Sequence, residues 1–488
     1  MAGTVDGSNL KKDRMTKKYK LYLGGKWVDR KEKLKVESPY DGKVVGEVAL
    51  ASKADFTKAI ELADNAFAQT RELPSYVREA ACKSIAEGIK KNFDEFSKTM
   101  ALEVGKAIRD CEVEVNRAIQ VFTIAGEEAK RIGGEIMDLD WIPGSEKRMG
   151  LIRRFPIGVI SGIAPFNFPL NLVAHKVAPA MASGNCIVLK PAPKTPLVSM
   201  MLAELIDKTD YPKGAISVLL GSNEDAEPLI KDERVKLITF TGSDKVGWWI
   251  KANSGKKKVV LELGGNAGVI VADDAELDYA TDRIVKGAFS QAGQSCISVQ
   301  RIFVQQSIYE KFLKMFVEKT KKLKVGDPLD RNTDIGTMVS KQAVQNTTAM
   351  VNQAKKQGAK VLTGGTADGG FYKPTIITNV KSSMDVCSKE AFAPIATVEK
   401  YNKFEDAVQK INDSDFGLQA GVFTNRLKDT FYAFNHIEAG GIVINDVPTF
   451  RADQQPYGGL KNSGLGREGI RYTIEDMTEI KVLSMNLK

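Results

Sequence analysis

Hydrophobic and polar residues follow two different periods along this chain. Residues 19–50 alternate short apolar runs with turn residues, a pattern that indicates strands and hairpins. From residue 53 to about residue 132, apolar residues recur every three or four positions, as in FTKAIELADNAFAQT. That spacing predicts amphipathic helices. The chain is therefore expected to open with a small β region followed by a helical layer.

Beyond residue 151, short β-branched runs alternate with helical segments. A first series contains GVISGIAP, NCIVLKPA, ISVLLGS and KLITFTGS. A second series begins at VVLELGG (259–265) and continues with AGVIVAD, VQRIFVQ, KVLTGG, ATVEKY, AGVFTN and GGIVIND. Strand–helix–strand alternation predicts parallel sheets with crossover helices. Because single cores stop growing at about 250–300 residues, two α/β units fit a chain of 488 residues.

Composition and charge narrow the classes of partner. No apolar run reaches the roughly 18 residues that a membrane helix requires, so we expect no membrane contact. The net charge is +9, but lysines are scattered among acids, as in KKNFDEFSK, which favours a solvated surface over nucleic-acid binding. The polar, basic N-terminus lacks the apolar core of a signal peptide. Residues 1–18 are predicted to form a flexible tail, and the protein to reside in the cytoplasm.

Cysteine and histidine usage argues against disulfides and metals. Five widely spaced cysteines form no disulfide framework and no CxxC pair. With only two histidines, a metal site is not expected. No GxSxG elbow supports a serine hydrolase.

Three residues are candidates for catalysis. Cys296 lies among small residues in SQAGQSCISVQR, where a loop can approach a ligand; the alternative is a buried structural thiol. Glu262 interrupts an apolar strand, so it is either a general base with a raised pKa or an exposed edge residue. Asn167 in GIAPFNFPLN could donate to an oxyanion or simply form a turn.

Other positions are candidates for nucleotide binding. The strand LITFT leads into Gly242-Ser243 and a helical segment, which would place backbone N–H groups at a helix N-terminus; ordinary strand–helix corners look the same. Lys190 ends the strand NCIVLK, within reach of a ribose or phosphate, although a strand-end lysine needs no such role. The segment GLGREG (464–469) matches GxGxxG. It follows no predicted strand, so we interpret it as a turn or a substrate-site loop.

Seven segments together resemble the aldehyde dehydrogenase superfamily. They are PFNFP (165–169), VLKPAPKTP (188–196), FTGS (240–243), LELGGN (261–266), GQSC (293–296), EAFAP (390–394) and PYGGLKNSGLGREG (456–469). The resemblance covers about residues 20–485. It implies an α/β fold with a Rossmann-like cofactor domain (19–132 and 152–261) and an α/β catalytic domain (262–471). It also implies a small β bridging element (133–151 and 472–488) that pairs subunits in homodimers or homotetramers.

The resemblance also implies residue roles in NAD(P)-dependent oxidation of an aldehyde to an acid. Cys296 matches the nucleophile, Glu262 the general base and Asn167 the oxyanion donor. Glu468 matches an acid that assists proton removal in part of the family. The implied cofactor contacts are Phe166, Lys190, Pro193, Lys194, Gly242, Ser243, Gly264, Glu390 and Phe392.

Departures from the family pattern bear on the cofactor. NAD-preferring members often carry a glutamate where this chain has Pro193, which is followed by Lys194. Loss of an acid removes repulsion against a 2′-phosphate, and a lysine attracts it. The sequence therefore favours NADP, with NAD as the alternative.

Five further positions bear on the substrate. Arg117 matches an arginine that binds substrate phosphate in non-phosphorylating glyceraldehyde-3-phosphate dehydrogenases, and Arg451 lies near another such arginine. His175 stands where many members have tryptophan, and Phe168 is a further candidate wall residue. Ser295 departs from the arginine that those enzymes place before the cysteine. An arginine pair predicts a small anionic or hydroxylated aldehyde, and structural salt bridges are the alternative.

Three other functions remain open at this stage. A CoA-acylating relative would pass the acyl group to CoA, although such members commonly lack the base that Glu262 matches. A generalist dehydrogenase would act on neutral aldehydes. A non-enzymatic protein could share the fold, because fold alone does not prove activity.

Overall fold

The computed structural model describes residues 17–487, and it begins with short strands at one end of the molecule. They are β1 (Lys17–Tyr19), β2 (Leu21–Leu23), β3 (Lys26–Val28), β4 (Lys33–Glu37) and β5 (Val44–Ala49). Strands β1, β5 and β4 form a three-stranded sheet, in which Lys17 pairs with Gly46. Residues 1–16 of the predicted tail lie outside the described residues. Residues 17 and 18 belong to β1, because pairing with β5 extends the sheet further than the polar sequence indicated.

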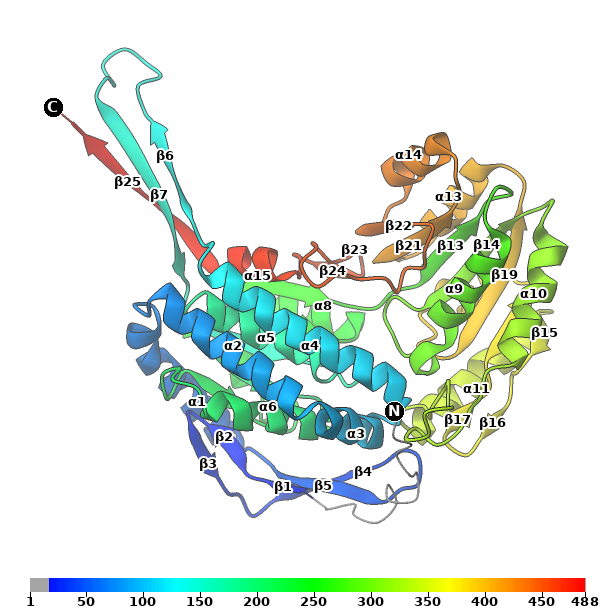
Figure 1. Cartoon of the computed structure of the whole chain (residues 1–488), viewed down its shortest axis with the longest axis horizontal. Coiled ribbons are helices and arrows are strands. Elements are labelled where there is room, and N and C mark those ends of the chain that lie inside the picture. The colour runs from blue at the N-terminus through cyan, green and yellow to red at the C-terminus, as the bar shows by residue number, and fades with distance from the viewer. Residues whose placement is uncertain (1–16, 488) are drawn as a thin grey trace, which may run out of the picture.

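Four helices follow where the apolar spacing predicted them. They are α1 (Lys53–Thr70), α2 (Ser75–Lys91), α3 (Phe93–Val104) and α4 (Ile108–Ala129). Helix α1 begins at a capping box, in which Ser52 and Asp55 each bond the other's backbone N–H. Figure 1 shows α2 and α4 side by side along the body of the molecule.

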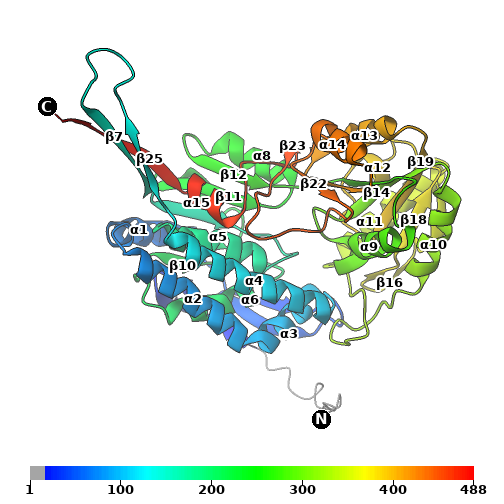
Figure 2. The ribbon, with the colours of Figure 1, turned by 45° about the horizontal axis from the view of Figure 1, so that its top comes forward.

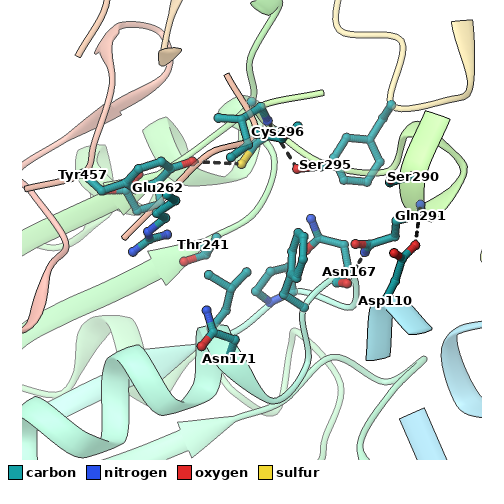
Figure 3. A pocket seen from close by; sticks show the side chains of 18 of the residues that line it. Asp110, Asn167, Asn171, Thr241, Glu262, Ser290, Gln291, Ser295, Cys296 and Tyr457 are labelled. Atoms are coloured by element: carbon teal, nitrogen blue, oxygen red, sulfur yellow. Dashed lines mark hydrogen bonds between the residues drawn. The ribbon is translucent and has the colours of Figure 1, made fainter. Parts of the chain in front are cut away.

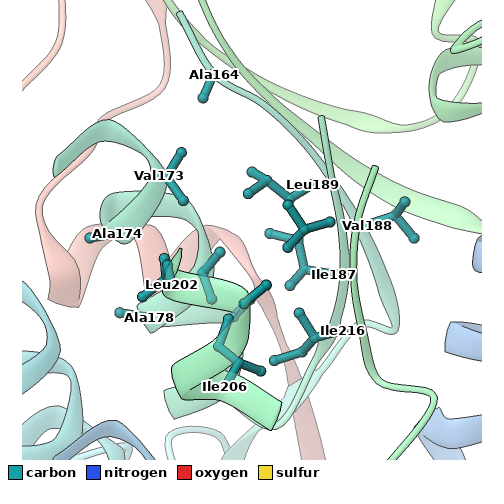
Figure 4. Close-up of a cluster of buried hydrophobic side chains, with 14 of the residues drawn as sticks. Ala164, Val173, Ala174, Ala178, Ile187, Val188, Leu189, Leu202, Ile206 and Ile216 are labelled. Atoms are coloured by element: carbon teal, nitrogen blue, oxygen red, sulfur yellow. The ribbon is translucent and has the colours of Figure 1, made fainter. Parts of the chain in front are cut away.

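An eight-stranded sheet forms the core of the first α/β unit. Its order is β24-β12-β11-β8-β9-β10-β2-β3. The strands not yet given are β8 (Val159–Ile163), β9 (Cys186–Lys190), β10 (Ile216–Val218), β11 (Val235–Thr241), β12 (Lys258–Glu262) and β24 (Gly464–Leu465). The helices are α5 (Asn171–Ala182), α6 (Leu197–Asp207), α7 (Pro228–Lys231) and α8 (Asp244–Asn253). Ile187 and Leu189 of β9 pack against α5 and α6 (Figure 4).

The strand β12 corrects one prediction. Its run VVLELGG was interpreted as the start of the second series, but β12 pairs in parallel with β11 and so belongs to the first sheet. Apolar periodicity predicts that a strand exists and does not identify its neighbours, which explains the error.

A seven-stranded sheet forms the second α/β unit, in the order β15-β18-β19-β14-β13-β21-β22. Its strands are β13 (Ala267–Val271), β14 (Val299–Gln305), β15 (Lys360–Thr363), β18 (Thr375–Thr378), β19 (Ile395–Tyr401), β21 (Gln419–Phe423) and β22 (Gly441–Ile444). Its helices are α9 (Leu277–Phe289), α10 (Tyr309–Lys321), α11 (Lys341–Lys356), α12 (Asp385–Ser388), α13 (Phe404–Asn412) and α14 (Leu427–His436). The strands β16 (Ala367–Asp368) and β17 (Phe371–Tyr372) form a small hairpin. The strands β20 (Phe416–Gly417) and β23 (Leu460–Lys461), which are distant in the sequence, form a second antiparallel pair.

Another three-stranded sheet projects from the body as a long arm (Figures 1 and 2). It contains β6 (Gly134–Asp138), β7 (Arg148–Pro156) and β25 (Thr478–Asn486), in the order β25-β7-β6. Helix α15 (Ile470–Asp476) leads from the body into β25. Two tandem α/β units with a separate β element agree with the predicted fold class, and the exact domain boundaries stay a prediction. No helix within residues 17–487 is both long enough and apolar enough to span a membrane.

Candidate active site

The predicted catalytic residues line one cavity of about 490 Å³. The carboxyl ends of β11 and β12, the loop between β8 and α5, and the segment 290–297 all contribute to its wall. Figure 3 shows Cys296, Glu262 and Asn167 around this pocket. Ligands of parallel α/β sheets bind at the carboxyl ends of the strands, so the topology brings these distant segments to the expected place.

Cys296 follows a strained turn after α9. Gln291 and Ala292 of the short helix η2 (Ser290–Gly293) have left-handed φ values of +56° and +54°. A Cβ on Gly293 would lie only 2.1 Å from the Ala393 carbonyl oxygen, so this position requires glycine. The turn therefore fixes the loop that presents the thiol.

The thiol of Cys296 contacts the hydroxyl of Tyr457. Its sulfur lies 3.4 Å from the hydroxyl oxygen of Tyr457, and burial raises the pKa of the thiol to about 12. The other four cysteines are buried in α2, α4, β9 and α12, as expected for structural thiols. Sequence analysis did not single out Tyr457, although it lies in the segment 456–469 that resembles the family, because a loop tyrosine carries no periodicity and no charge that would mark it.

Glu262 is the last residue of β12 and is 3% exposed. Neither of its carboxylate oxygens has a hydrogen-bond partner among residues 17–487. Burial, followed by the nearby charge of Glu468, raises its pKa well above the usual range. The edge-exposed alternative is therefore wrong, and this carboxylate has the properties of a proton acceptor.

Glu468 lies beside Glu262 in a buried charge network. It accepts hydrogen bonds from Lys176 Nζ at 3.3 Å and from Arg451 Nη2 at 3.0 Å. Although burial opposes ionisation, these two cations hold the pKa of Glu468 at about 2. The GLGREG segment thus belongs to the wall of the cavity.

Lys176 was missed by sequence analysis. It is fully buried in α5 and also donates to the hydroxyls of Thr239 and Thr241 of β11. The sequence did contain a signal for Lys176, because it lies inside the apolar helix NLVAHKVAPAMA. Burial of a charged side chain there is as costly as burial of Glu262 in its strand.

Asn167 lies buried in the loop that leads from β8 to α5. Its Nδ2 donates to the Gln294 carbonyl at 3.2 Å, and its Oδ1 has no partner among the described residues. The amide therefore faces the loop that carries Cys296.

Helix α4 holds both catalytic loops. Lys106, just before the helix, contacts the Asn167 carbonyl at 3.4 Å and pairs with Glu114. Asp110 accepts a hydrogen bond from the Gln291 N–H at 3.2 Å. Sequence analysis did not single out these three charged residues, because their helical spacing resembles an ordinary solvated face.

The residues predicted to bind the nicotinamide lie around Glu390. This carboxylate accepts from the Gly265 N–H at 2.9 Å, and burial raises its pKa to about 7. Phe166 and Phe392 meet edge to face with their ring centroids 5.9 Å apart. A Cβ on Gly264 would come within 2.8 Å of Glu390, so the glycine allows this close approach.

The residues predicted to bind the adenosine half of the cofactor lie at the ends of β9 and β11. Ser243 caps α8 through its backbone only, which leaves the N-terminus of the helix open beside Gly242. Lys190 Nζ donates to Asn223 Oδ1 at 3.3 Å, and burial lowers its pKa. Pro193 and Lys194 are exposed in the following turn. An open helix N-terminus and a buried lysine at the strand ends fit a dinucleotide.

Arg117 and Arg451 line the cavity, but both have carboxylate partners within the chain. Arg117 Nη2 lies 2.6 Å from Asp453 Oδ1 in a two-bonded contact. Arg451 binds Glu468 and stacks over the Tyr457 ring, 3.8 Å from its centroid. These salt bridges are the alternative that the sequence left open. Asp453, in an irregular loop, carried no signal for this role.

His175 does not line the cavity, which contradicts its prediction as a substrate residue. It is fully buried, and its Nε2 lies 2.9 Å from Asp453 Oδ1. Its place inside α5, facing the core, explains the difference. Phe168 does line the cavity, and Lys106 Nζ lies 4.3 Å from its ring centroid.

Two further cations, Arg283 and Lys286 of α9, also line the cavity. Arg283 is paired with Asp446 at 2.6 Å. Lys286 is exposed and forms no ion pair within residues 17–487. The lining includes four carboxyl groups, those of Asp110, Glu262, Glu390 and Glu468. Lys286 is thus a cation at the cavity that no carboxylate of the described residues neutralises by direct contact.

Comparison with known proteins agrees with this geometry. The model of the aldehyde dehydrogenase family matches residues 27–483. The 3-sulfolactaldehyde dehydrogenase of Priestia megaterium is 44% identical over 472 residues, which cover 96% of this chain and 98% of the relative. The lactaldehyde dehydrogenase of Methanocaldococcus jannaschii is 39% identical over 468 residues, covering 95% and 99%.

Two solved structures are also similar. Aldehyde dehydrogenase 21 from Physcomitrella patens, in complex with the reaction product succinate, has a TM-score of 0.96 and 44% identity, covering 97% of this chain and 99% of that one. The glyceraldehyde-3-phosphate dehydrogenase GapN from Methanocaldococcus jannaschii, complexed with NADP, has a TM-score of 0.90 and 38% identity, covering 94% and 100%. The chain belongs to the aldehyde dehydrogenase family, whose members oxidise aldehydes with NAD(P).

Proposed function

We propose that this enzyme oxidises a small aldehyde that carries an anionic group. The observation that supports this most directly is Lys286, an unpaired cation that lines the cavity, to which Arg117 and Arg283 also contribute. Relatives are named for sulfolactaldehyde and glyceraldehyde-3-phosphate, and a similar structure holds succinate. Each of these compounds is an anion of three or four carbons, which an unpaired lysine at the cavity would attract.

The proposed reaction uses Cys296 as a covalent nucleophile. Its thiolate attacks the aldehyde carbon, and the Asn167 amide and the Cys296 backbone N–H donate to the oxyanion that forms. When bound, the nicotinamide of NAD(P) supplies the acceptor for the hydride that leaves this carbon. The resulting thioester is attacked by water, which loses its proton to Glu262, and the acid leaves as Cys296 recovers its thiol proton. Removal of one oxyanion donor typically costs about 3–4 kcal/mol.

We propose NADP as the preferred cofactor. Lys194 is exposed in the turn after β9, and Pro193 places no carboxylate there to repel a 2′-phosphate. Lys194→Ala should raise the KM for NADP several-fold and leave the KM for NAD nearly unchanged. Equal effects on both cofactors would contradict this preference.

We further propose that the enzyme assembles into a homodimer or homotetramer through its arm and resides in the cytoplasm. Ile136 on β6 is 70% exposed, and Ile480, Val482 and Leu483 on β25 are each more than half exposed. Such an apolar strand edge favours pairing with a second copy. Five cysteines without a disulfide suit a reducing compartment. Sedimentation of the full chain would give the number of subunits.

Kinetics with paired substrates test the proposed substrate class. Succinate semialdehyde and glyceraldehyde-3-phosphate would be compared with propanal and benzaldehyde, with NAD and with NADP. Lys286→Ala should raise the KM for the anionic aldehydes at least fivefold and leave that for propanal unchanged. Lys314→Ala, an exposed lysine on α10, is the matched control. Best turnover of neutral aldehydes would identify a generalist, and a requirement for CoA would identify an acylating enzyme.

A further inference from the structure

A second cavity, of about 430 Å³, lies at the base of the arm. Its wall comes from the first turn of α2, the ends of α4 and α5, and the start of the arm in β7 and β25. It shares no lining residue with the cavity of Cys296. Figures 1 and 2 show the arm leaving the body above α2, close to α15. We name this second cavity the arm cavity.

The arm cavity is strongly cationic. Its lining contains the five cations Arg71, Arg78, Lys130, Arg153 and Arg154, and its lining carboxylate is Glu72. Such an excess of one charge in a concave space raises the local concentration of counter-ions of the opposite sign.

Two of these cations have carboxylate partners. Lys130 pairs with Glu79 at 2.7 Å. Arg71 lies 3.4 Å from Glu72, but the two side chains are 42% and 79% exposed, so this contact neutralises little charge. Glu72 is therefore weakly held and can turn to solvent when an anion arrives.

The other three arginines have no ion pair within residues 17–487. Arg154 Nη1 makes only long contacts, of 3.4 Å each, to the Glu475 carbonyl and to Thr478 Oγ1, which are neutral acceptors. Arg78 donates to the Ala182 carbonyl, and its Nε is buried without a partner. Most of the hydrogen-bonding capacity of these guanidinium groups is thus unused.

The N-terminus of α2 adds positive electrostatic potential to the same cavity. The residue before the helix is Pro74, which offers no side-chain cap, and the first helical residue Ser75 lines the cavity. The N-terminus of a 17-residue helix carries a partial positive charge and unpaired N–H groups. Arginine side chains and a helix terminus converge here from elements that are far apart in the sequence.

We propose that the arm cavity binds a phosphorylated small metabolite with at least two negative charges. Guanidinium groups match phosphate oxygens in pairs, which distinguishes such a ligand from a simple counter-ion. The volume lies within the range of about 300–1,000 Å³ that small-molecule sites occupy, so a sugar phosphate fits. The ligand would connect the arm to α2 and would stabilise the folded protein by binding it selectively.

Calorimetry on the full chain tests the proposal, with pyrophosphate and glucose 6-phosphate as probes. Saturating NADP is present throughout, so that the cofactor site is filled. The expected result is one saturable site per subunit and a rise in the melting temperature beyond that in sodium chloride of equal ionic strength. Arg154→Gln should weaken binding at least tenfold. The double variant Arg71→Gln/Arg153→Gln, which changes only exposed side chains, should do the same without affecting folding.

Two controls locate the binding. Arg148→Gln removes an exposed arginine of β7 that does not line the arm cavity, and it should leave the affinity within twofold of the wild type. Arg117→Gln changes the other cavity and should also leave it unchanged. Binding that no arm-cavity variant weakens, binding that Arg148→Gln or Arg117→Gln weakens equally, or no saturable binding would overturn the proposal.

Discussion

The hydroxyl of Tyr457 lies 3.4 Å from the sulfur of Cys296, and the face of the same ring carries the guanidinium of Arg451 at 3.8 Å. Arg451 in turn binds Glu468, which lies near Glu262. The nucleophile and the candidate base are therefore joined through one buried aromatic ring and one ion pair. Substitutions of Tyr457 and Glu468 can therefore test the proposed mechanism while Cys296 and Glu262 stay in place.

Replacement of Tyr457 by phenylalanine should slow the reaction of the thiol. The hydroxyl lowers the pKa that burial raises to about 12, so its loss should reduce the thiolate fraction further. We expect the rate of alkylation by iodoacetamide to fall about threefold to tenfold at pH 8. In both proteins the rate should keep rising as the pH is raised from 7 to 10. An unchanged alkylation rate would show that the hydroxyl does not act on the thiol.

Short β-branched runs and helical spacing predicted most of the fold, whereas the roles of the three proposed catalytic residues followed from the resemblance to the family. The buried strands appear in the sequence as short β-branched runs, and Glu262 is conspicuous at the end of one of them. The partners of these residues could not be predicted in the same way. Tyr457 and Asp453 come from loops without periodicity, and only the folded chain brings them to Cys296 and Arg117.

The arginine residues show where pattern matching is insufficient. Arg117 and Arg451 line the cavity, and their contact with substrate stays a prediction. A sequence pattern does not reveal that Asp453 and Glu468 already neutralise them. Lys286, which no carboxylate of the described residues contacts directly, lies on α9 with two aspartates and an arginine, a mixture that resembles an ordinary solvated helix face. Its position depends on how the second α/β unit packs against the first.

Glu262→Gln should separate hydride transfer from hydrolysis. Without a carboxylate to accept the proton of water, the thioester should form and then persist. We expect a burst of about one NAD(P)H per active site, followed by turnover at least a hundredfold slower than in the wild type. Stopped-flow absorbance at 340 nm measures both phases, and mass spectrometry of the quenched protein should find the acyl group on Cys296. A variant with full steady-state turnover would remove Glu262 from the mechanism.

Glu468→Gln should shift the pH dependence of hydrolysis. The charge of Glu468, held at a pKa of about 2, adds to burial in raising the pKa of Glu262. Its removal leaves Lys176 and Arg451 to act on Glu262 alone, so the pKa of Glu262 should fall. The acidic limb of the kcat profile should therefore move to lower pH, measured under conditions where hydrolysis limits the rate. A shift to higher pH would contradict the assigned coupling.

Asp453→Asn should destabilise the protein in a pH-dependent way. Although burial opposes it, the hydrogen bond from His175 and the charge of Arg117 hold the pKa of Asp453 well below its usual range. A depressed pKa in the folded state contributes stability above the unfolded value of about 3.9, and this contribution is lost as the pH falls towards the folded value. Because Arg117 would keep its charge without a partner, we expect the free energy of unfolding to fall by about 2–4 kcal/mol at pH 7.

Urea unfolding of the wild type and the variant at pH 7 and at pH 3 measures this destabilisation, which should be smaller at pH 3. Arg283→Gln, which breaks a more exposed pair, is the comparison and should cost about 1 kcal/mol. An Asp453 effect that stays constant between the two pH values would mean that the carboxylate does not stabilise the fold through its charge.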